Sequence, residues 1–316
     1  MSRFSLALTD APAPLAALEI SAGRVTGVSL ADRGGRPAIV AHATESLPEQ
    51  ALVPGLTALN VRDRAAVAGA VSRVLEAIGK PRRTGLVVAD PVAKVSLVKL
   101  QQVPARAQEL EQIIRWQVRK SAPFAIEDAQ VGFGRGLLGD DGQEFIVTLA
   151  RRDVIAEYEQ LCAAAGAHAG IVDLSTFNVV NAVLAAGSVP PGDWLLVNVA
   201  PGWESIALMR GPQLIFFRSR GADGEGTLAD LVHQTAMYYE DRLNGSGFSR
   251  VMLGGATTAG GVDALRRTLA ERLGNRVETI DPTRAVGFAE RISADAGLLD
   301  AVTPLVGLIL RTREAA

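Results

Sequence analysis

The sequence predicts an α/β fold in which two similar lobes are separated by a small inserted α+β subdomain. Two observations support this prediction. The order strand, strand, strand, helix, strand occurs once in each half of the chain, and the residues between these blocks follow a different order. At 316 residues the chain is long enough to bury two hydrophobic cores.

The first block begins near the N-terminus as a meander of strands. Residues 22–24 and 33–36 contain glycine and separate short apolar runs, as hairpin turns do. Apolar side chains then recur at the spacing of a helix that lies on a sheet, and a last apolar run is bounded by Gly85 and Asp90-Pro91. We expect strands at residues 15–21, 25–31, 37–46 and 86–89, and a helix at residues 67–78.

The second block repeats this order without obvious residue identity. Turn signals at Pro201-Gly202 and Gly211-Pro212 divide its first three apolar runs. We expect strands at residues 194–199, 205–209, 213–219 and 251–253, and a helix at residues 228–239.

The inserted residues read as strand, helix, hairpin and helix. The first helix, at residues 104–121, has Pro104 in its first turn and stops before Pro123. One face of this helix carries Leu110, Ile113, Ile114, Gln117 and Val118 at helical spacing, and Trp116 lies off this face. The expected division is residues 1–92 for part of the first lobe, 93–168 for the insertion, 169–193 for a return helix and linker, 194–300 for the second lobe and 301–316 for a C-terminal helix that returns to the first lobe.

Composition and charge indicate an ordinary globular protein. Hydrophobic residues make up 48% and charged residues 21%, and the formal charge of -2 argues against nucleic-acid binding by bulk charge. No apolar run approaches the ~20 residues of a membrane span, and residues 1–12 lack the features of a signal peptide. The single Cys162 excludes an internal disulfide, so we expect a cytoplasmic protein without direct membrane insertion.

The repeated order resembles the ribonuclease-H-like lobe of the actin and sugar-kinase superfamily, whose members hold nucleotide between two lobes. The insertion is similar to the subdomain that the cell-division protein FtsA and its relatives carry. This resemblance implies an actin-like fold with a nucleotide cleft.

Residues spread along the chain resemble the type IV pilus assembly protein PilM family. Ile114-Arg115-Trp116-Gln117, then Lys120 and Pro123-Phe124, is similar to that family's "IRWE…PF" signature. Other similar runs are residues 170–173, Arg218, residues 238–239, residues 253–255, Pro304 and residues 307–311. The resemblance covers roughly residues 15–312.

The two phosphate motifs depart from the family pattern. Where the family reads much like "GIDIGSSSVK", residues 17–26 have Glu19 for the aspartate, Ser21 for a glycine and Thr26 for the lysine. The second motif, usually close to "DIG", becomes Asn198-Val199-Ala200. In phosphoryl transfer, most of the catalysis comes from orienting the attacking water and neutralising the leaving phosphate. Because both motifs are altered, we expect that ATP hydrolysis is lost.

The resemblance implies a degenerate nucleotide cleft, and ATP with magnesium is expected to bind weakly or not at all. We expect no catalytic residue and no metal ligand, since His42, His168 and His233 match no metal-site spacing. The residues that the resemblance assigns to the cleft are Glu19, Ser21, Asn198, Gly202, Gly254 and Gly255.

By the same resemblance the protein would be a cytoplasmic scaffold of type IV pilus or type II secretion assembly. It would bind the N-terminal tail of an inner-membrane PilN-type protein between the first lobe and the insertion, with the helix at residues 104–121 as one wall. The resemblance leaves open whether the protein also contacts the assembly motor ATPase and whether it forms a homo-oligomer. The partner-binding residues expected are Ile113, Trp116, Gln117, Lys120 and Phe124.

Two other functions compete with the scaffold. One is an active ATPase of the same family, and the other is a small-molecule kinase, which would need glycine-rich phosphate loops and an aspartate base that the sequence lacks. An FtsA-like membrane-anchored filament is not expected, because no amphipathic stretch follows residues 307–311.

Overall fold

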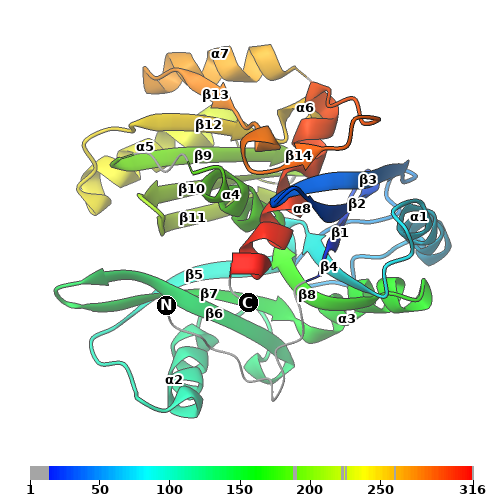
Figure 1. Cartoon of the computed structure of the whole chain (residues 1–316). Helices are drawn as coiled ribbons and strands as arrows, with labels where there is room; N and C mark the ends of the chain where they lie inside the picture. The colour runs from blue at the N-terminus through cyan, green and yellow to red at the C-terminus, as the bar shows by residue number, and fades with distance from the viewer. Residues whose placement is uncertain (1–13, 188–190, 222–223, 225, 260, 315–316) are drawn as a thin grey trace.

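The computed structural model describes residues 14–187, 191–221, 224, 226–259 and 261–314. Within these residues the strands form three sheets, and Figure 1 shows the smallest of them at the bottom of the molecule. No helix among them is both long enough and apolar enough to cross a bilayer. The expectation that residues 1–12 do not form a signal peptide concerns a segment outside the described residues.

The first sheet is built on the hairpins of the first block. Its strand order is β14-β3-β2-β1-β4-β8, with β1 antiparallel to β2 and parallel to β4. The turn after β2 holds Gly34 and Gly35 at φ +64° and +82°, where glycine is favoured. The strands are β1 (Ala16–Ser21), β2 (Arg24–Arg33), β3 (Arg36–Ser46), β4 (Arg83–Val88), β8 (His168–Leu174) and β14 (Gly287–Phe288).

Helices cover both faces of the first sheet. α1 (Arg64–Ala77) and α3 (Arg152–Ala164) share one core with alternate residues of β1, such as Leu18. The intervening residues, such as Ala17, face the opposite core under α8 (Ala296–Glu314). Each face of β1 is therefore apolar, which explains the continuous hydrophobic run in its sequence.

The second sheet repeats the topology of the first. Its order is β11-β10-β9-β12-β13, with β9 antiparallel to β10 and parallel to β12. α5 (Leu228–Leu243) and α7 (Val262–Leu273) cover one face, and α4 (Ser175–Ala185) covers the other. The strands are β9 (Asp193–Ala200), β10 (Trp203–Arg210), β11 (Gln213–Gly221), β12 (Arg250–Gly254) and β13 (Val277–Thr279). The predicted fold of two similar lobes is confirmed.

α4 and α8 lie between the two sheets and cross each other at close range. α4 packs on the second sheet and α8 on the first, so their crossing joins the lobes. The crossing depends on Gly307, because a Cβ there would lie 1.7 Å from the carbonyl oxygen of Asn178 in α4. Only glycine allows the backbones this approach.

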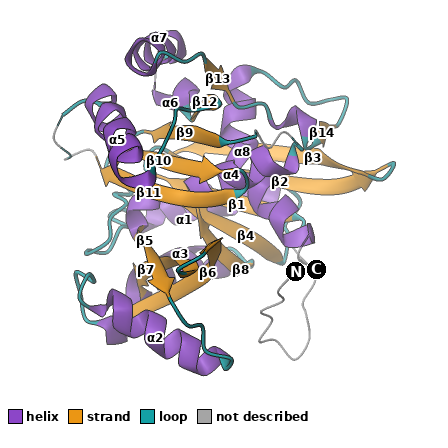
Figure 2. Ribbon diagram, turned by 90° about the vertical axis from the view of Figure 1, so that its left-hand side faces the viewer, coloured by secondary structure: helices purple, strands orange, loops and turns teal. Residues whose placement is uncertain are grey.

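The small sheet has the order β5-β7-β6 and carries a helix on one face. α2 (Ala107–Arg119) packs on it through Leu110, Ile114 and Val118. Figures 1 and 2 both place α2 on the side of this sheet that faces away from the lobes. The strands of this sheet are β5 (Ala93–Leu100), β6 (Ala129–Gly139) and β7 (Gly142–Arg151). Elsewhere in the chain as well as beside this sheet there are short 3-10 helices: η1 (Asp90–Val92), η2 (Ile126–Asp128) and η3 (Pro282–Arg284).

Several elements differ from the sequence expectation. Residues 168–174 form the edge strand β8, and the helix that follows begins only at Ser175. α3 packs with α1 on the first sheet, not with the small sheet. β14 pairs with β3 of the first sheet, although it precedes residue 300. α2 starts at Ala107, because the backbone at Arg106 is still extended, so Pro104 lies outside the helix.

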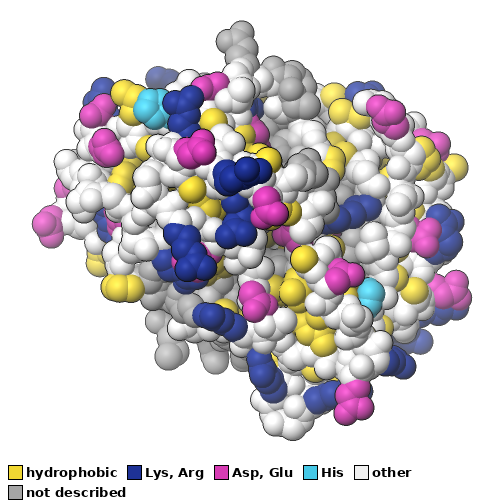
Figure 3. All heavy atoms as spheres, turned by 90° about the horizontal axis from the view of Figure 1, so that it is seen from above, with side chains coloured by type: hydrophobic (Ala, Val, Ile, Leu, Met, Phe, Trp, Pro, Cys, Tyr) yellow, Lys and Arg dark blue, Asp and Glu magenta, His cyan; other side chains and the backbone are white. Residues whose placement is uncertain are grey.

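The charged side chains are mixed in sign on the face seen from above the molecule. Figure 3 shows lysine and arginine side chains interspersed with aspartate and glutamate on this face. The mixing agrees with the formal net charge of -2.

Candidate functional site

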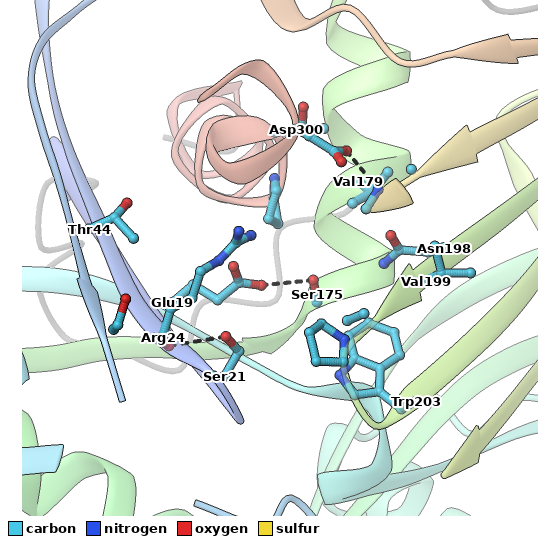
Figure 4. A pocket seen from close by; sticks show the side chains of 18 residues that line it. Glu19, Ser21, Arg24, Thr44, Ser175, Val179, Asn198, Val199, Trp203 and Asp300 are labelled. Carbon is cyan, nitrogen blue, oxygen red and sulfur yellow. Dashed lines mark hydrogen bonds between the residues drawn. The ribbon is translucent and has the colours of Figure 1, made fainter. Parts of the chain in front are cut away.

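A cavity of about 300 Å³ lies between the two lobes, where the first hairpin of each sheet meets α8. In Figure 4, Glu19 and Arg24 come from the first lobe, Asn198 and Trp203 from the second, and Asp300 from α8. The described lining consists of Glu19, Ser21, Gly23, Arg24, Thr44, Ser46, Ser175, Val179, Asn198, Val199, Ala200, Pro201, Trp203, Gly254, Gly255, Asp300, Thr303 and Pro304.

Glu19 is a buried carboxylate held at the end of β1. Its Oε1 accepts a hydrogen bond from the Ser175 hydroxyl at 3.0 Å, and only 6% of the residue is exposed. Burial raises the pKa of Glu19, against the opposing effects of the Arg24 guanidinium and the Ser175 hydroxyl. The side chain therefore has a fixed partner within the protein.

Asn198 belongs to a buried polar chain that links the lobes. Its Nδ2 donates to the Thr176 hydroxyl at 2.8 Å, and that hydroxyl donates in turn to Asp90. The backbone N–H of Thr176 also donates to Asp90, at 3.0 Å. Burial raises the pKa of Asp90 to about 6, although the Thr176 hydrogen bonds lower it. The amide of Asn198 is thus used inside the protein.

Asp300 occupies the donors of the glycine loop after β12. Its carboxylate accepts the backbone N–H of Gly255 at 2.6 Å, and both the N–H and the hydroxyl of Thr257, at 2.9 and 2.5 Å. An anion bound at this loop would need these same donors. The protein supplies that negative charge from its own helix α8.

The glycines of this loop have a structural explanation. Gly255 has φ +72°, and a Cβ there would lie 1.8 Å from the carbonyl oxygen of Val199. A Cβ on Gly254 would lie 3.0 to 3.1 Å from Ile280 and from the side-chain oxygen of Asn198. Close packing against β9 therefore accounts for both residues without a ligand.

The remaining expected residues divide between the cavity and its surroundings. Ser21 lines the cavity, but its hydroxyl donates to the Arg24 carbonyl at 3.0 Å and closes the turn. Gly202 is not among the lining residues, and its φ of +84° fits the turn between β9 and β10. Thr26 is buried beside Thr44, with their hydroxyl oxygens 3.3 Å apart.

The described lining brings more acidic than basic side chains to this cavity. Among the described lining residues Arg24 is the one basic side chain, whereas Glu19 and Asp300 both bring carboxylates. A triphosphate carries several negative charges and would meet these carboxylates at close range. Within the described residues, no group of three or more histidine, cysteine, aspartate or glutamate side chains is placed to hold a metal.

A second hollow, which we call the groove, lies between the small sheet and the lobes. It consists of adjoining cavities of about 140 and 560 Å³ that share Gly132, Thr148, Val172 and Asp173. One wall is formed by β6 and β7, and the other by β8 and α4. The larger cavity extends to Leu214 of β11 and to Arg311 of α8.

The groove is flanked by two strands at sheet edges. β6 is an edge of the small sheet and β8 an edge of the first sheet. Gly132 and Gly134 of β6 face the groove, whereas Val131 and Phe133 pack in the core under α2. A Cβ on Gly134 would meet no atom within 4 Å, so the wall is open at this point.

An ion pair closes part of the groove. Arg311 Nη1 lies 2.7 Å from Asp173 Oδ2, and both side chains line the larger cavity. Burial raises the pKa of Asp173, while the Arg311 guanidinium lowers it. Arg135 lines the same cavity and adds a positive charge.

The expected partner-binding residues on α2 lie away from this groove. α2 packs on the opposite face of the small sheet, and none of its described residues lines either cavity. Trp116 is 67% exposed, whereas Phe124 is half-buried in the core beneath α2. The helix at residues 104–121 is therefore not a wall of the groove.

Several residues of these sites were missed by sequence reasoning. Asp300 is a single acid within an apolar helix, and Asp90 precedes a proline at a strand end, so each has an ordinary explanation. Ser175, Thr176 and Arg24 carry no motif. Only the fold brings Ser175 and Arg24 to the cavity and Thr176 to its lining residue Asn198. The alternation of glycine at 132, 134 and 136 was the one available signal for the groove.

The family model for the type IV pilus assembly protein PilM matches residues 17–241. The chain belongs to this family. A solved PilM-PilN type IV pilus biogenesis complex is 20% identical, covers 94% of this chain and 98% of that chain, and has a TM-score of 0.79. This likeness and the family match confirm the expected actin-like fold class.

Two further solved structures are more distant. The cytoplasmic domain of EpsL, an inner-membrane component of the type II secretion system of Vibrio cholerae, is 10% identical over 95% of this chain and 94% of that chain, with a TM-score of 0.49. A Bacteroides thetaiotaomicron protein with an actin-like ATPase fold is 11% identical over 85% of this chain and 91% of that chain, with a TM-score of 0.47. No curated protein is similar enough to the chain to count as a match.

Proposed function

We propose that this PilM-family protein is a scaffold of type IV pilus assembly on the cytoplasmic side of the inner membrane. It holds the N-terminal tail of a PilN-type membrane protein in the groove and does not hydrolyse ATP. The observation that carries the proposal is the groove itself, which has an open glycine wall between two sheet edges.

The groove meets the physical needs of an extended peptide. A tail that leaves water must replace its backbone hydrogen bonds, and the free edges of β6 and β8 offer donors and acceptors for this purpose. Apolar side chains from α4, such as Val180 and Leu184, can take up alternate side chains of the peptide. Glycine at 132 and 134 lets the peptide backbone approach the sheet closely.

The cleft supports the absence of hydrolysis. Asn198 has no charge at the position where phosphoryl transfer needs a carboxylate, and its amide donates a hydrogen bond to the Thr176 hydroxyl. Asp300 already accepts the hydrogen bond from the Gly255 N–H in the glycine loop, and Glu19 accepts one from the Ser175 hydroxyl. A catalytic site for phosphoryl transfer would need these groups free to meet phosphate, metal or water.

Filling the groove tests the scaffold. The variant Gly134→Leu places a side chain in open space, since neither a positive φ nor a close neighbour restricts this position. We expect a labelled synthetic peptide, matching the N-terminal tail of a PilN-type membrane protein, to bind the variant at least tenfold more weakly, a loss of about 1.4 kcal/mol.

The matched control is Gly55→Leu, which also adds a side chain in open space but lies in a loop that does not line the groove. It should bind the peptide like the parent protein. If the parent shows no binding, or if Gly134→Leu binds as tightly as the control, the scaffold proposal is wrong at this groove.

Calorimetry with magnesium and ATP tests the cleft separately. We expect no binding with Kd below about 1 mM, because the carboxylates of Glu19 and Asp300 face the cavity. Micromolar binding accompanied by phosphate release would refute the absence of hydrolysis while leaving the peptide result intact.

A further inference from the structure

The outer face of α2 is an exposed stripe with an unusual order of side chains. Positions 109, 113, 116 and 120 share one face at helical spacing, opposite the buried positions 110, 114 and 118. Trp116 is 67% exposed and Ile113 36% exposed, so two large apolar groups lie side by side in water. The order along the stripe is acid, apolar, apolar, base: Glu109, Ile113, Trp116, Lys120.

This order is self-complementary when one helix is laid against a reversed copy of itself. Glu109 then stands opposite Lys120 at both ends, and Ile113 stands opposite Trp116 in the middle. We propose that this face of α2 binds the same face of a second copy of the chain, with the helices antiparallel about a two-fold axis. Such an interface uses one patch twice and closes on itself.

The helix geometry supports the arrangement. Ile113 and Trp116 lie roughly 4.5 Å apart along the axis, so the four apolar side chains of two copies gather around the two-fold. Glu109 and Lys120 lie roughly 16 Å apart, which places one ion pair at each end of this cluster. Antiparallel helices also oppose their macrodipoles favourably.

The neighbouring charges do not oppose the pairing. Glu109 lies 3.2 Å from Arg106, but both side chains are more than half exposed, and such surface pairs contribute little. Arg115 and Glu111 form their own pair at 2.9 Å on the flank of the helix away from the stripe. Gln112 and Gln117 flank the stripe as uncharged polar groups, which suits the rim of an interface.

The interface is small, and the groove stays accessible. One helix face buries less than the roughly 800 Å² per partner of a typical stable complex, so the dimer should be weak and depend on concentration. α2 and the groove lie on opposite faces of the small sheet. Two copies can therefore pair while each holds a peptide, and failure of one site does not imply failure of the other.

Sedimentation equilibrium of the full chain tests the proposal, with the parent protein measured over a hundredfold range of concentration. We expect a monomer–dimer equilibrium that Trp116→Ala weakens at least tenfold. The control is Leu138→Ala, because Leu138 is 75% exposed at the β6–β7 hairpin and lies off the stripe. A parent protein that stays monomeric, or a dimer that responds equally to both variants, would overturn the proposal.

A charge exchange tests the antiparallel register. Glu109→Lys and Lys120→Glu should each weaken self-association, because each places like charges opposite one another at both ends. An equal mixture of the two variants should associate more strongly than either variant alone, since each unlike pair is then restored. If the mixture behaves as the average of its components, the proposed pairing is wrong.

Discussion

The crossing of α4 and α8 makes Gly307→Ala the most informative single substitution in the fold. In a helix interior this change normally stabilises a protein by about 1 kcal/mol, because alanine loses less backbone freedom on folding. Here the new Cβ would lie 1.7 Å from the Asn178 carbonyl oxygen and 2.9 Å from the Ala182 nitrogen. The first distance is about half that of an ordinary contact.

The overlap cannot be relieved by turning a side chain, since the opposing atoms belong to the backbone of α4. The helices must move apart, and that movement loosens the cores under both sheets. Overpacking of a core usually costs about 1 to 3 kcal/mol. Because backbone atoms overlap here, we expect a cost of about 3 kcal/mol or more. After the helix gain is subtracted, we expect a net loss of about 2 kcal/mol or more.

Chemical denaturation followed by circular dichroism measures this loss, with Gly69→Ala as the matched control. Gly69 also lies inside a helix, α1, but a Cβ there meets only the mobile end of Arg73 at 3.3 Å. The control should keep the gain of about 1 kcal/mol. If Gly307→Ala is as stable as Gly69→Ala, the account of the crossing is refuted.

Three further predictions follow from buried polar groups. Because burial raises the pKa of Asp90 from 3.8 to about 6, the folded protein retains a proton that the unfolded chain loses, so stability falls as pH rises through that window. Asp90→Asn should remove about 3 kcal/mol of this fall, measured as the difference from the parent protein in denaturation at each pH. Tyr158→Phe should cost about 1 to 2 kcal/mol in the same denaturation assay, because the buried Tyr158 hydroxyl donates to Asn60 at 2.9 Å. Cys162 is buried and its pKa is raised to about 12, so a thiol reagent should label it only when the protein is unfolded by denaturant, and rapid labelling of the native protein would contradict its burial.

The strands and helices of both lobes could be predicted because their apolar spacing is local. α1, for example, buries the residues that its periodicity selects, and β1 buries its continuous apolar run on both faces. The partner of a helix is not local information. α3 has the same kind of stripe whether it packs on the small sheet or on the first sheet, and only the fold shows that it packs beside α1.

The candidate sites were predictable only in part, for the same reason. Glu19 and Asn198 lie near the ends of the first strands of the two lobes, β1 and β9, so the repeated topology brings them to one cavity. Asp300 reaches the same cavity from a helix almost at the end of the sequence, and nothing in its neighbours marks it. β8 was missed because its sequence, HAGIVDL, has a short apolar run and lies at a sheet edge.

α8 has a consequence for how the two sites influence each other. Asp300 contacts the glycine loop at the cleft, and Arg311 contacts Asp173 at the groove, roughly 16 Å further along the same helix. Gly307 fixes this helix against α4 between those two points. Under the proposed function, a peptide that displaced Arg311 would act on the same helix that supplies the Asp300 contacts. A peptide that changed the free energy of those contacts would be subject to thermodynamic reciprocity. A substitution that releases Asp300 would then change the binding free energy of the peptide by the same amount.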